Sequence, residues 1–382
     1  MSEKYTMCTK CVMDTTDPDI IFNDQGVCNH CLHYDKQINQ LPKGDEAERA
    51  LVELIEKIKK DGKSREYDCI IGLSGGVDST YVAYLVKEKF GLRPLAVHLD
   101  NGWNSELSVT NMENIVKKLD IDLYTHVIDW EEFKDIQLSF LKSSTPDSEV
   151  PTDHAIFSVL RQVAKKYNIK NVINGINIKT ESHHALSWSQ GHSDFGYIKG
   201  VQKIFGTKKI KTFPHGNRLT ILEDIFSKKW INILNYIDYD KNEAKKIITE
   251  KLEWKDYGGK HYESIYTKFY QGYILPTKFG YDKRKMHLSS LICAGVITRD
   301  EAIDELNQPP YPVHEQLDDR EYLIKKFKIS EEEFDEIMNR PIKTYYDYPS
   351  YYGKILKSKY LHSIKRLAKF ILGQRTKKNL NN

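Results

Sequence analysis

Long apolar runs are missing from this sequence of 382 residues. No run could span a bilayer, and the first residues lack the basic and apolar regions of a signal peptide. Cysteine is also scarce, at six residues, and four of these stand in two close pairs. So few cysteines do not make a disulfide scaffold in a chain of this length, and they indicate a reducing compartment and a metal site. We therefore expect a cytoplasmic protein.

A large excess of charge of either sign is absent as well, because 57 basic residues nearly balance 54 acidic ones. Basic charge gathers at the end, where nine Lys or Arg residues and no acidic residue follow Gly353. The rest of the chain is consequently net acidic. Since a polyanion such as tRNA usually requires a broad basic face, we expect no nucleic acid partner.

The clearest functional signal lies at residues 67–80, where the sequence reads YDCIIGLSGGVDST. An apolar strand is followed by a Gly-rich turn and by the start of a helix, whose unpaired N–H groups favour an anion. No lysine follows the glycines, so the turn is not a Walker A loop, and backbone amides and hydroxyls must hold a phosphate. Asp78 would repel that phosphate unless a divalent cation lay between them, which implies Mg²⁺.

The string Ser-Gly-Gly-Val-Asp-Ser, placed between a strand and a helix, resembles the PP-loop of the N-type ATP pyrophosphatases. That superfamily contains asparagine synthetases, NAD synthetases and tRNA thiolases. The resemblance implies that ATP is cleaved between its α- and β-phosphates, that an acceptor oxygen is adenylated, and that pyrophosphate lies in this loop. The implied ligands of ATP or pyrophosphate here are Ser74, Gly75, Gly76, Val77, Asp78 and Ser79, and Asp78 also has a catalytic and a magnesium-binding role.

Two Cys-x-x-Cys pairs near the start have the spacing of a zinc ribbon, because sixteen residues separate them. Four thiolates would close a tetrahedral shell without an open position, so we expect a structural zinc site. His30 and His33 are alternative ligands, but a surface or supporting position is favoured for both. The expected zinc ligands are Cys8, Cys11, Cys28 and Cys31.

After an amphipathic connecting helix over residues 44–60, apolar strands alternate with helical patterns. This alternation predicts an α/β fold with a parallel sheet and helices on both faces, of the PP-loop (adenine nucleotide α-hydrolase-like) type. The expected strands are 68–73, 94–99, 122–128 and 171–175, and the expected helices are 79–90, 106–119, 131–142 and 152–167.

The later part of the chain is expected to be helical, at 225–237, 241–252, 262–275, 284–294, 299–306, 320–328 and 331–339. The resulting domain organisation is a zinc ribbon at 1–40, a connecting helix at 41–66, a PP-loop domain at 67–223, a helical region at 224–353 and a basic amphipathic tail at 354–382. The tail could lie on an anionic membrane surface, but packing on the body or on a partner is favoured.

Ligands of a parallel sheet bind at the carboxyl ends of its strands. The residues expected there for ATP are Leu99, Asp100, Asn101 and Gly175, whereas Asp129 is interpreted as a helix cap. The irregular segment 178–220 is expected to be a substrate loop, where Trp188 could stack on a sugar ring. Metal binding by the adjacent His183 and His184 is disfavoured, since they lack helical ligand spacing. The expected substrate residues are Asp153, Asn174, Asn177, Glu181, His184 and Trp188.

A basic run at 278–287 has two interpretations. It could be a solvated helix start, or its cations could neutralise the triphosphate and the departing pyrophosphate. On the second interpretation Lys278 and Arg284 act in catalysis, Lys285 binds ATP, and Asp282 orients Arg284.

The ribbon, the loop, Asn174-Gly175-x-Asn177 and the segments 260–264 and 269–279 together resemble the N-acetyl sugar amidotransferases, over roughly residues 5–310. Members of that family act in O-antigen and flagellin-glycan synthesis. The resemblance implies that an acetamido group of a sugar, as in a nucleotide sugar, becomes an acetamidino group at the expense of ATP. Cys69 and Cys293 are interpreted as core residues rather than nucleophiles. We therefore expect ammonia to come from a separate glutaminase subunit, which in that family is accompanied by a cyclase-like barrel subunit.

Two other classes remain open. A tRNA-modifying PP-loop enzyme of the thiolase or lysidine type would share the ribbon and the loop, but thiolases commonly need further catalytic cysteines. A non-catalytic scaffold would bind ATP without releasing AMP.

Overall fold

The structure is a computed structural model that describes residues 5–216 and 230–353. Its centre is a sheet of five strands: β1 (Cys69–Gly72), β2 (Pro94–Asp100), β3 (Asp122–Val127), β4 (Val172–Asn174) and β5 (Trp230–Asn232). All neighbouring strands are parallel, in the order β3-β2-β1-β4-β5. The chain passes outward to one side of β1 first and later to the other side, so the topological switch point lies between β1 and β4.

Helices cover both faces of this sheet. Side chains alternate along β1, so that Ile70 joins one hydrophobic cluster whereas Cys69 and Ile71 join another. The cluster of Ile71 contains residues of α2 (Asp45–Gly62), α3 (Val77–Tyr84), α4 (Glu106–Leu119) and α10 (Lys241–Leu252). The cluster of Ile70 contains residues of α5 (Trp130–Ser143), α6 (Val150–Lys166), α8 (Phe195–Phe205), α11 (Ile265–Phe269), η4 (Tyr270–Phe279), α14 (Val313–Phe327) and α15 (Glu331–Asn339). The predicted α/β fold is confirmed.

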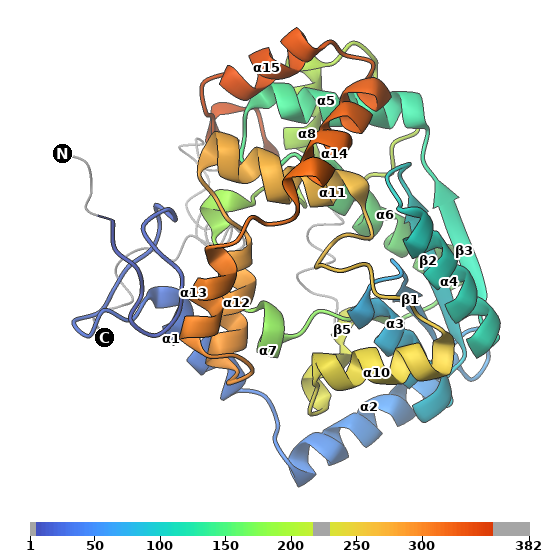
Figure 1. Cartoon of the computed structure of the whole chain (residues 1–382). Helices are drawn as coiled ribbons and strands as arrows, with labels where there is room; N and C mark the ends of the chain where they lie inside the picture. The colour runs from blue at the N-terminus through green and yellow to red at the C-terminus, as the bar shows by residue number, and fades with distance from the viewer. Residues whose placement is uncertain (1–4, 217–229, 354–382) are drawn as a thin grey trace, which may run out of the picture.

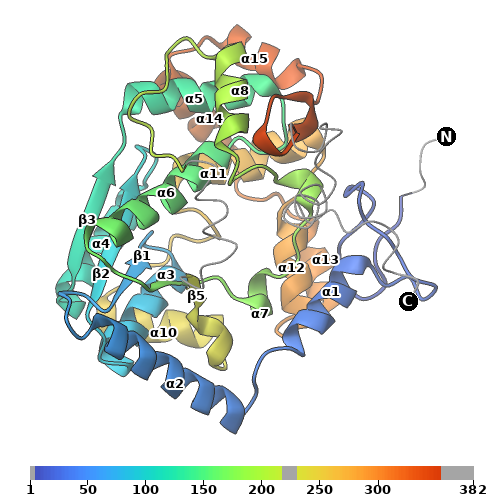
Figure 2. The ribbon, with the colours of Figure 1, turned by 180° about the vertical axis from the view of Figure 1, so that it is seen from behind.

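The N-terminal ribbon lies apart from the sheet, beside α12 (Arg284–Cys293) and α13 (Arg299–Leu306), as both views show (Figure 1, Figure 2). Its helix α1 (Asn29–Ile38) contacts α12. The guanidinium of Arg299 donates hydrogen bonds to the carbonyl oxygens of Cys8 (3.1 Å) and Cys11 (3.0 Å). The remaining elements are short: η1 (Leu85–Lys89), α7 (Ile178–Glu181), η2 (Leu186–Trp188), η3 (Ile233–Tyr236) and η5 (Tyr345–Asp347).

Several predicted segments differ from the observed ones. The helix expected at 320–328 begins earlier, at Val313, and the one expected at 262–275 begins at Ile265 and continues as η4. The helix expected at 225–237 is wrong over residues 230–236, which form β5 and η3. The segment 178–220, expected to be irregular, contains the eleven-residue helix α8. The basic tail and the first part of the helix expected at 225–237 lie outside the described residues. Of the helices that are described, none combines the length and the apolar character that crossing a membrane requires.

One buried carboxylate fastens the end of the described chain to α8. Asp194 is fully buried and caps α8 by accepting a hydrogen bond from the N–H of Tyr197 at 3.0 Å. It also accepts bonds from the hydroxyl of Tyr345 at 2.8 Å and from the N–H groups of Tyr351 and Tyr352, both at 3.1 Å. Four hydrogen-bond donors therefore share the Asp194 carboxylate as their acceptor.

We expect Asp194→Asn to lower the free energy of unfolding by roughly 2–4 kcal/mol, because the amide turns an N–H toward donors that need an acceptor. Asp129→Asn is the matched control: Asp129 caps α5 by accepting from the N–H of Glu132 but is exposed, and Asn is an equally good cap. Urea unfolding measures both. Equal midpoints for the two variants would contradict this role of Asp194.

Candidate functional site

The Gly-rich turn leaves β1 and enters α3 at the topological switch point. Gly75 has φ +80°, and a Cβ there would lie 2.8 Å from the carbonyl oxygen of Ser108 on α4. The indole N–H of Trp254 donates a hydrogen bond of 2.8 Å to the carbonyl oxygen of Gly75. The turn therefore needs glycine both for its backbone conformation and for its close contact with α4.

Hydroxyl groups hold the turn from inside. Ser79 Oγ accepts from the N–H of Ser74 at 3.3 Å and donates to the carbonyl oxygen of Gly76 at 3.1 Å. Ser74 Oγ in turn accepts from the N–H of Gly76 at 3.2 Å. Gly76 is the N-cap of α3, and in the described part of the chain no side chain caps this helix. The first turn of α3 therefore presents its N–H groups and the positive end of its dipole to an anion.

The end of β4 lies against the start of α3. A Cβ on Gly175 would come 3.0 Å from Cβ of Asp78, so glycine permits this approach. Asn174 Oδ1 accepts from the N–H of Ile176 at 2.9 Å, and the buried Asn177 caps α7 through Thr180 at 2.9 Å. Asn174 and Asn177, expected to bind substrate, therefore shape the backbone that brings Gly175 to Asp78.

Charged groups of both signs surround Asp78. The hydroxyl of Tyr239 donates a hydrogen bond to Asp78, and Lys260 Nζ lies 2.9 Å from Oε1 of Glu181. Burial and the charge of Glu181 raise the pKa of Asp78, against the lowering effect of Lys241 and Lys260. We call Asp78, Glu181, Tyr239, Lys241 and Lys260 the loop cluster.

The two lysines of the loop cluster differ in their pKa. Burial lowers the pKa of Lys241 at the start of α10, although Asp78 opposes this shift. Burial also acts to lower the pKa of Lys260, but Glu181 and Asp78 outweigh it and the pKa is raised. His287 on α12, with Nδ1 3.5 Å from Lys260 Nζ, has a pKa lowered to about 2 by burial and by both lysines. It is therefore neutral beside two cations.

The segment after α10 lies across the turn. A Cβ on Gly76 would lie 3.2 Å from the hydroxyl of Tyr257 and 3.6 Å from a carboxylate oxygen of Glu263. The carbonyl oxygen of Glu263 accepts from the N–H of Ser105, at 2.9 Å, in the loop that follows β2. Residues 257–263 therefore border the phosphate turn.

Two expected substrate residues lie in a second neighbourhood, around His192. The Nε2 of His192 lies 3.1 Å from Asp147 and 3.4 Å from Asp153. The side chain of Asp153 is 46% exposed, yet burial and the nearby acids raise its pKa to about 6. Burial and the charges of His192 and Lys283 lower the pKa of the exposed His184 to about 4. Solvent therefore reaches both groups although protein surrounds them.

The expected residues after β2 mainly form its turn. Leu99 packs in the core, Asp100 accepts from the N–H of Gly102 at 2.9 Å, and Asn101 accepts from the N–H of Trp103 at 3.1 Å. The backbone of β2 nevertheless runs beside β1, so this turn borders the carboxyl end of the sheet next to the phosphate turn.

The cations expected at 278–285 are engaged elsewhere. Lys278 Nζ donates to the carbonyl oxygens of Ile337, Met338 (3.1 Å) and Arg340 (3.2 Å) at the end of α15. Asp282 orients Arg284, as expected, but the guanidinium binds carbonyl oxygens at the end of α13. Lys285 pairs with the buried Asp14 of the ribbon. These contacts correct the expectation that the three cations meet phosphate, since they instead join helices and the ribbon.

Trp188 is fully buried and stacks on Tyr281, with ring centroids 5.0 Å apart. Its Nε1–H donates to the carbonyl oxygen of Thr16 in the ribbon at 3.3 Å. The expectation that Trp188 stacks on a sugar is therefore corrected, because this indole fills the contact between ribbon and body.

The four cysteines of the ribbon converge. Their sulfurs lie 3.7 Å apart for Cys11 and Cys28, 3.7 Å for Cys28 and Cys31, and 4.0 Å for Cys8 and Cys31, and all four residues are buried. A tetrahedral zinc ion with four thiolates requires sulfurs about 3.8 Å apart. The donor set and its spacing fit the structural zinc site that the sequence predicts.

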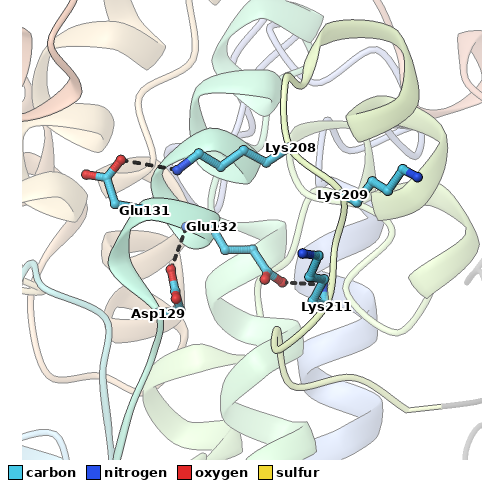
Figure 3. A pocket seen from close by; sticks show the side chains of 6 residues that line it. All are labelled: Asp129, Glu131, Glu132, Lys208, Lys209 and Lys211. Carbon is cyan, nitrogen blue, oxygen red and sulfur yellow. Dashed lines mark hydrogen bonds and ion pairs between the residues drawn. The ribbon is translucent and has the colours of Figure 1, made fainter.

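A surface pocket at the start of α5 is lined by Asp129, Glu131, Glu132, Lys208, Lys209 and Lys211 (Figure 3). Its carboxylates already have partners: Lys208 lies 3.2 Å from Glu131, and Glu132 accepts from the backbone N–H of Lys211 at 2.8 Å. Asp129 is the helix cap that was expected. The loop cluster, which combines a phosphate turn with cations, is the stronger candidate.

Comparison with known proteins adds two family matches. Residues 48–187 match the model of the NAD synthase family, and residues 263–365 match the family described as LPS biosynthesis protein WbpG-like, C-terminal domain. An uncharacterized protein of Methanocaldococcus jannaschii is 24% identical over 323 residues, which cover 81% of this chain and 97% of that protein.

Solved structures are matched more distantly. An NMN synthetase from Francisella tularensis is 16% identical and matches 57% of this chain and 100% of its own, with a TM-score of 0.29. An NH₃-dependent NAD synthetase from Campylobacter jejuni is 16% identical and matches 54% of this chain and 93% of its own, with a TM-score of 0.30. The two family matches together support an ATP-dependent enzyme of the amidating or ligase type.

We expect Gly75→Ala to weaken ATP binding at least tenfold, because the new methyl group collides with Ser108 and moves the turn. Gly280→Ala is the matched control: Gly280 has φ +70°, but a Cβ there meets nothing within 4 Å. Both variants carry the strain of a left-handed residue, about 1 kcal/mol, so both should melt slightly earlier. Calorimetric titration with ATP and Mg²⁺ separates them, and equal affinities would contradict the steric argument.

Proposed function

We propose, from the combination of a PP-loop domain with a WbpG-like C-terminal region, that this chain is an ATP-dependent sugar amidotransferase. It converts an acetamido group of an N-acetylated, nucleotide-linked sugar into an acetamidino group and releases AMP and pyrophosphate. The observation that carries this proposal is the loop cluster, where a turn suited to pyrophosphate faces two half-buried lysines and two carboxylates.

Phosphate binding in the proposal uses the turn and the lysines together. The N–H groups of α3 bind phosphate oxygens, while Lys241 and Lys260 neutralise the charge that grows on the departing pyrophosphate. Both lysines are half-buried, which strengthens their interaction with phosphate relative to exposed cations. They take the role that the sequence suggested for Lys278 and Arg284.

The carboxylates Asp78 and Glu181 fit Mg²⁺, which prefers hard oxygen ligands and is usually held by one or two protein carboxylates. Magnesium, when bound, would screen the negative charge of the phosphates. Tyr239 orients Asp78, and Lys260 orients Glu181, so that both carboxylates keep fixed positions.

The reaction requires activation of an amide, since its carbonyl oxygen is a poor leaving group. If that oxygen attacks the α-phosphorus of ATP, pyrophosphate leaves and an O-adenylyl imidate forms. Ammonia then adds to the imidate carbon and AMP departs, which leaves the amidine. The protein's task in this sequence is alignment, charge neutralisation and exclusion of water.

We assign the acceptor sugar to the surroundings of Asp153 and His184. With a pKa of about 6, Asp153 can donate or accept a hydrogen bond near neutral pH, which suits sugar hydroxyls. His184, with its pKa lowered to about 4, is neutral at that pH and offers both a donor and an acceptor.

Ammonia in the proposal comes from a separate glutaminase subunit, accompanied by a cyclase-like barrel subunit. A built-in glutaminase would require an accessible nucleophilic cysteine. All six cysteines lie in the described residues: four form the ribbon, Cys69 is fully buried in β1, and Cys293 lies against the ribbon. This distribution supports an external source of ammonia.

The first test measures AMP released from ATP with Mg²⁺ and ammonium, with UDP- and CMP-linked N-acetyl sugars or bulk tRNA as acceptors. We expect release that depends on the sugar, together with a product in which NH replaces oxygen by mass. Asp78→Ala should abolish both signals, because it removes a carboxylate that would hold the Mg²⁺ needed to offset the charge of the phosphates. Release with tRNA alone would instead indicate RNA modification, and nucleotide binding without AMP would indicate a scaffold.

The second test compares two lysines. Lys260→Met should lower kcat at least a hundredfold, because it removes a cation at the developing charge and leaves Glu181 unpaired. Lys278→Met should retain turnover but lose about 1–3 kcal/mol of stability, because carbonyl oxygens at the end of α15 lose their donor. Steady-state kinetics and urea unfolding are measured for both variants. A large loss of kcat in Lys278→Met, with turnover retained in Lys260→Met, would restore the catalytic role of Lys278.

A further inference from the structure

Two potential metal ligands outside the four-cysteine set, His183 and Cys293, meet Cys31 at its edge. Cys293 Sγ lies 3.6 Å from Cys31 Sγ, and His183 Nε2 lies 3.7 Å from Cys31 Sγ and 3.9 Å from Cys293 Sγ. They come from three separate segments: α1, the chain just after α7, and the last residue of α12. Cys293, expected to lie in the core, is partly exposed instead.

These distances fit a tetrahedral metal ion. With zinc–sulfur bonds of about 2.3 Å and zinc–nitrogen bonds of about 2.05 Å, tetrahedral angles place two sulfurs about 3.8 Å apart and a sulfur and a nitrogen about 3.6 Å apart. The three atoms can therefore bind one ion with only small shifts. Thiolate and imidazole are also the ligand types that zinc selects.

The hydrogen bonds of His183 prepare its Nε2 for a metal. The hydroxyl of Ser290 donates to the carbonyl oxygen of Met286 at 3.1 Å. The Ser290 oxygen therefore acts as an acceptor for His183. It accepts hydrogen bonds from the backbone N–H of His183 at 3.1 Å and from the ring Nδ1–H at 3.0 Å. The ring proton is therefore on Nδ1, and the lone pair of Nε2 faces the two sulfurs. A ring held in this way is typical of a metal-ligating histidine.

Charge near the site favours a second cation as well. The four-thiolate set around one zinc ion carries a net charge of about −2, and Cys293 would add another thiolate at its edge. A second divalent ion would offset much of this negative charge inside the protein.

We propose that Cys31, His183 and Cys293 bind a second zinc ion, with the Cys31 thiolate bridging it to the ion of the ribbon. Cys31 and His183 are buried, whereas the partial exposure of Cys293 leaves the fourth position to a water molecule. Binding releases the proton of the Cys293 thiol to solvent, since Cys31 is already a thiolate in the ribbon site, and no oxidation is involved.

The second ion connects the ribbon to the loop cluster. His183 follows Glu181 by two residues, and Cys293 is on the same helix as His287, the neighbour of Lys260. One metal thus fixes both segments that position the Glu181–Lys260 pair, even though it does not itself touch the phosphate turn. The role is one of positioning, and it stands whether or not the proposed reaction is correct.

The test is the metal content of the purified full chain, measured by mass spectrometry against protein concentration. We expect two zinc ions per chain in the wild type and one in Cys293→Ala and in His183→Gln. Cys69→Ala, which removes a buried thiol remote from the ribbon, should keep two. One ion per chain in the wild type would overturn the proposal, as would two ions in both ligand variants.

Cadmium substitution of the wild type gives a second readout that needs no variant. We expect two ¹¹³Cd resonances, one from a site with four sulfurs and one, shifted to lower frequency, from a site with two sulfurs and a nitrogen. The shared Cys31 sulfur should couple them. A single resonance would overturn the proposal even if the variants failed to fold.

Discussion

The hydrogen bond from the indole of Trp254 to the carbonyl oxygen of Gly75 joins the phosphate turn to the segment that carries Lys260. Gly75 makes this bond in a left-handed conformation, and the carbonyl oxygen of Ser108 lies where a side chain would be. Because the turn is fixed between α4 and this segment, the cations and the helix dipole point toward the same space. Moving the turn would therefore separate the phosphate ligands from the charges that serve them.

The sequence was sufficient for β1 to β4, the turn and the ribbon, since each depends on residues close together in the chain. The buried strands are short apolar runs that alternate with amphipathic helices. A Gly-Gly turn after a strand indicates a phosphate site, and two Cys-x-x-Cys pairs indicate a zinc site, with few alternative interpretations. The strand β5 was missed because its three residues cannot display a period. An apolar Ile231 between two half-buried residues fits a helix equally well.

Side chains that meet across long sequence separations could not be predicted in the same way. Among 57 basic residues, nothing local distinguishes Lys241 and Lys260 from Lys278. Lys260 could have been predicted, since it begins the segment 260–264 that resembles the amidotransferases. Its partner Glu181, however, is 79 residues away in the sequence. Trp188 and Cys293 were misinterpreted for the same reason, because their surroundings come from the ribbon at the other end of the chain.

The carboxylate of Asp194 also has a consequence for the newly made protein. Its last donor, Tyr352, is 158 residues further along the chain. At a synthesis rate of about 5–20 residues per second, the ribosome needs roughly 8–32 s to supply that residue. During this interval the Asp194 carboxylate lacks three of its four hydrogen-bond donors, and the aromatic residues of α8 are not yet packed against residues 345–352. A chaperone that protects this face during translation, or a protease that removes chains stopped short of it, would therefore act on a normal stage of the protein's life.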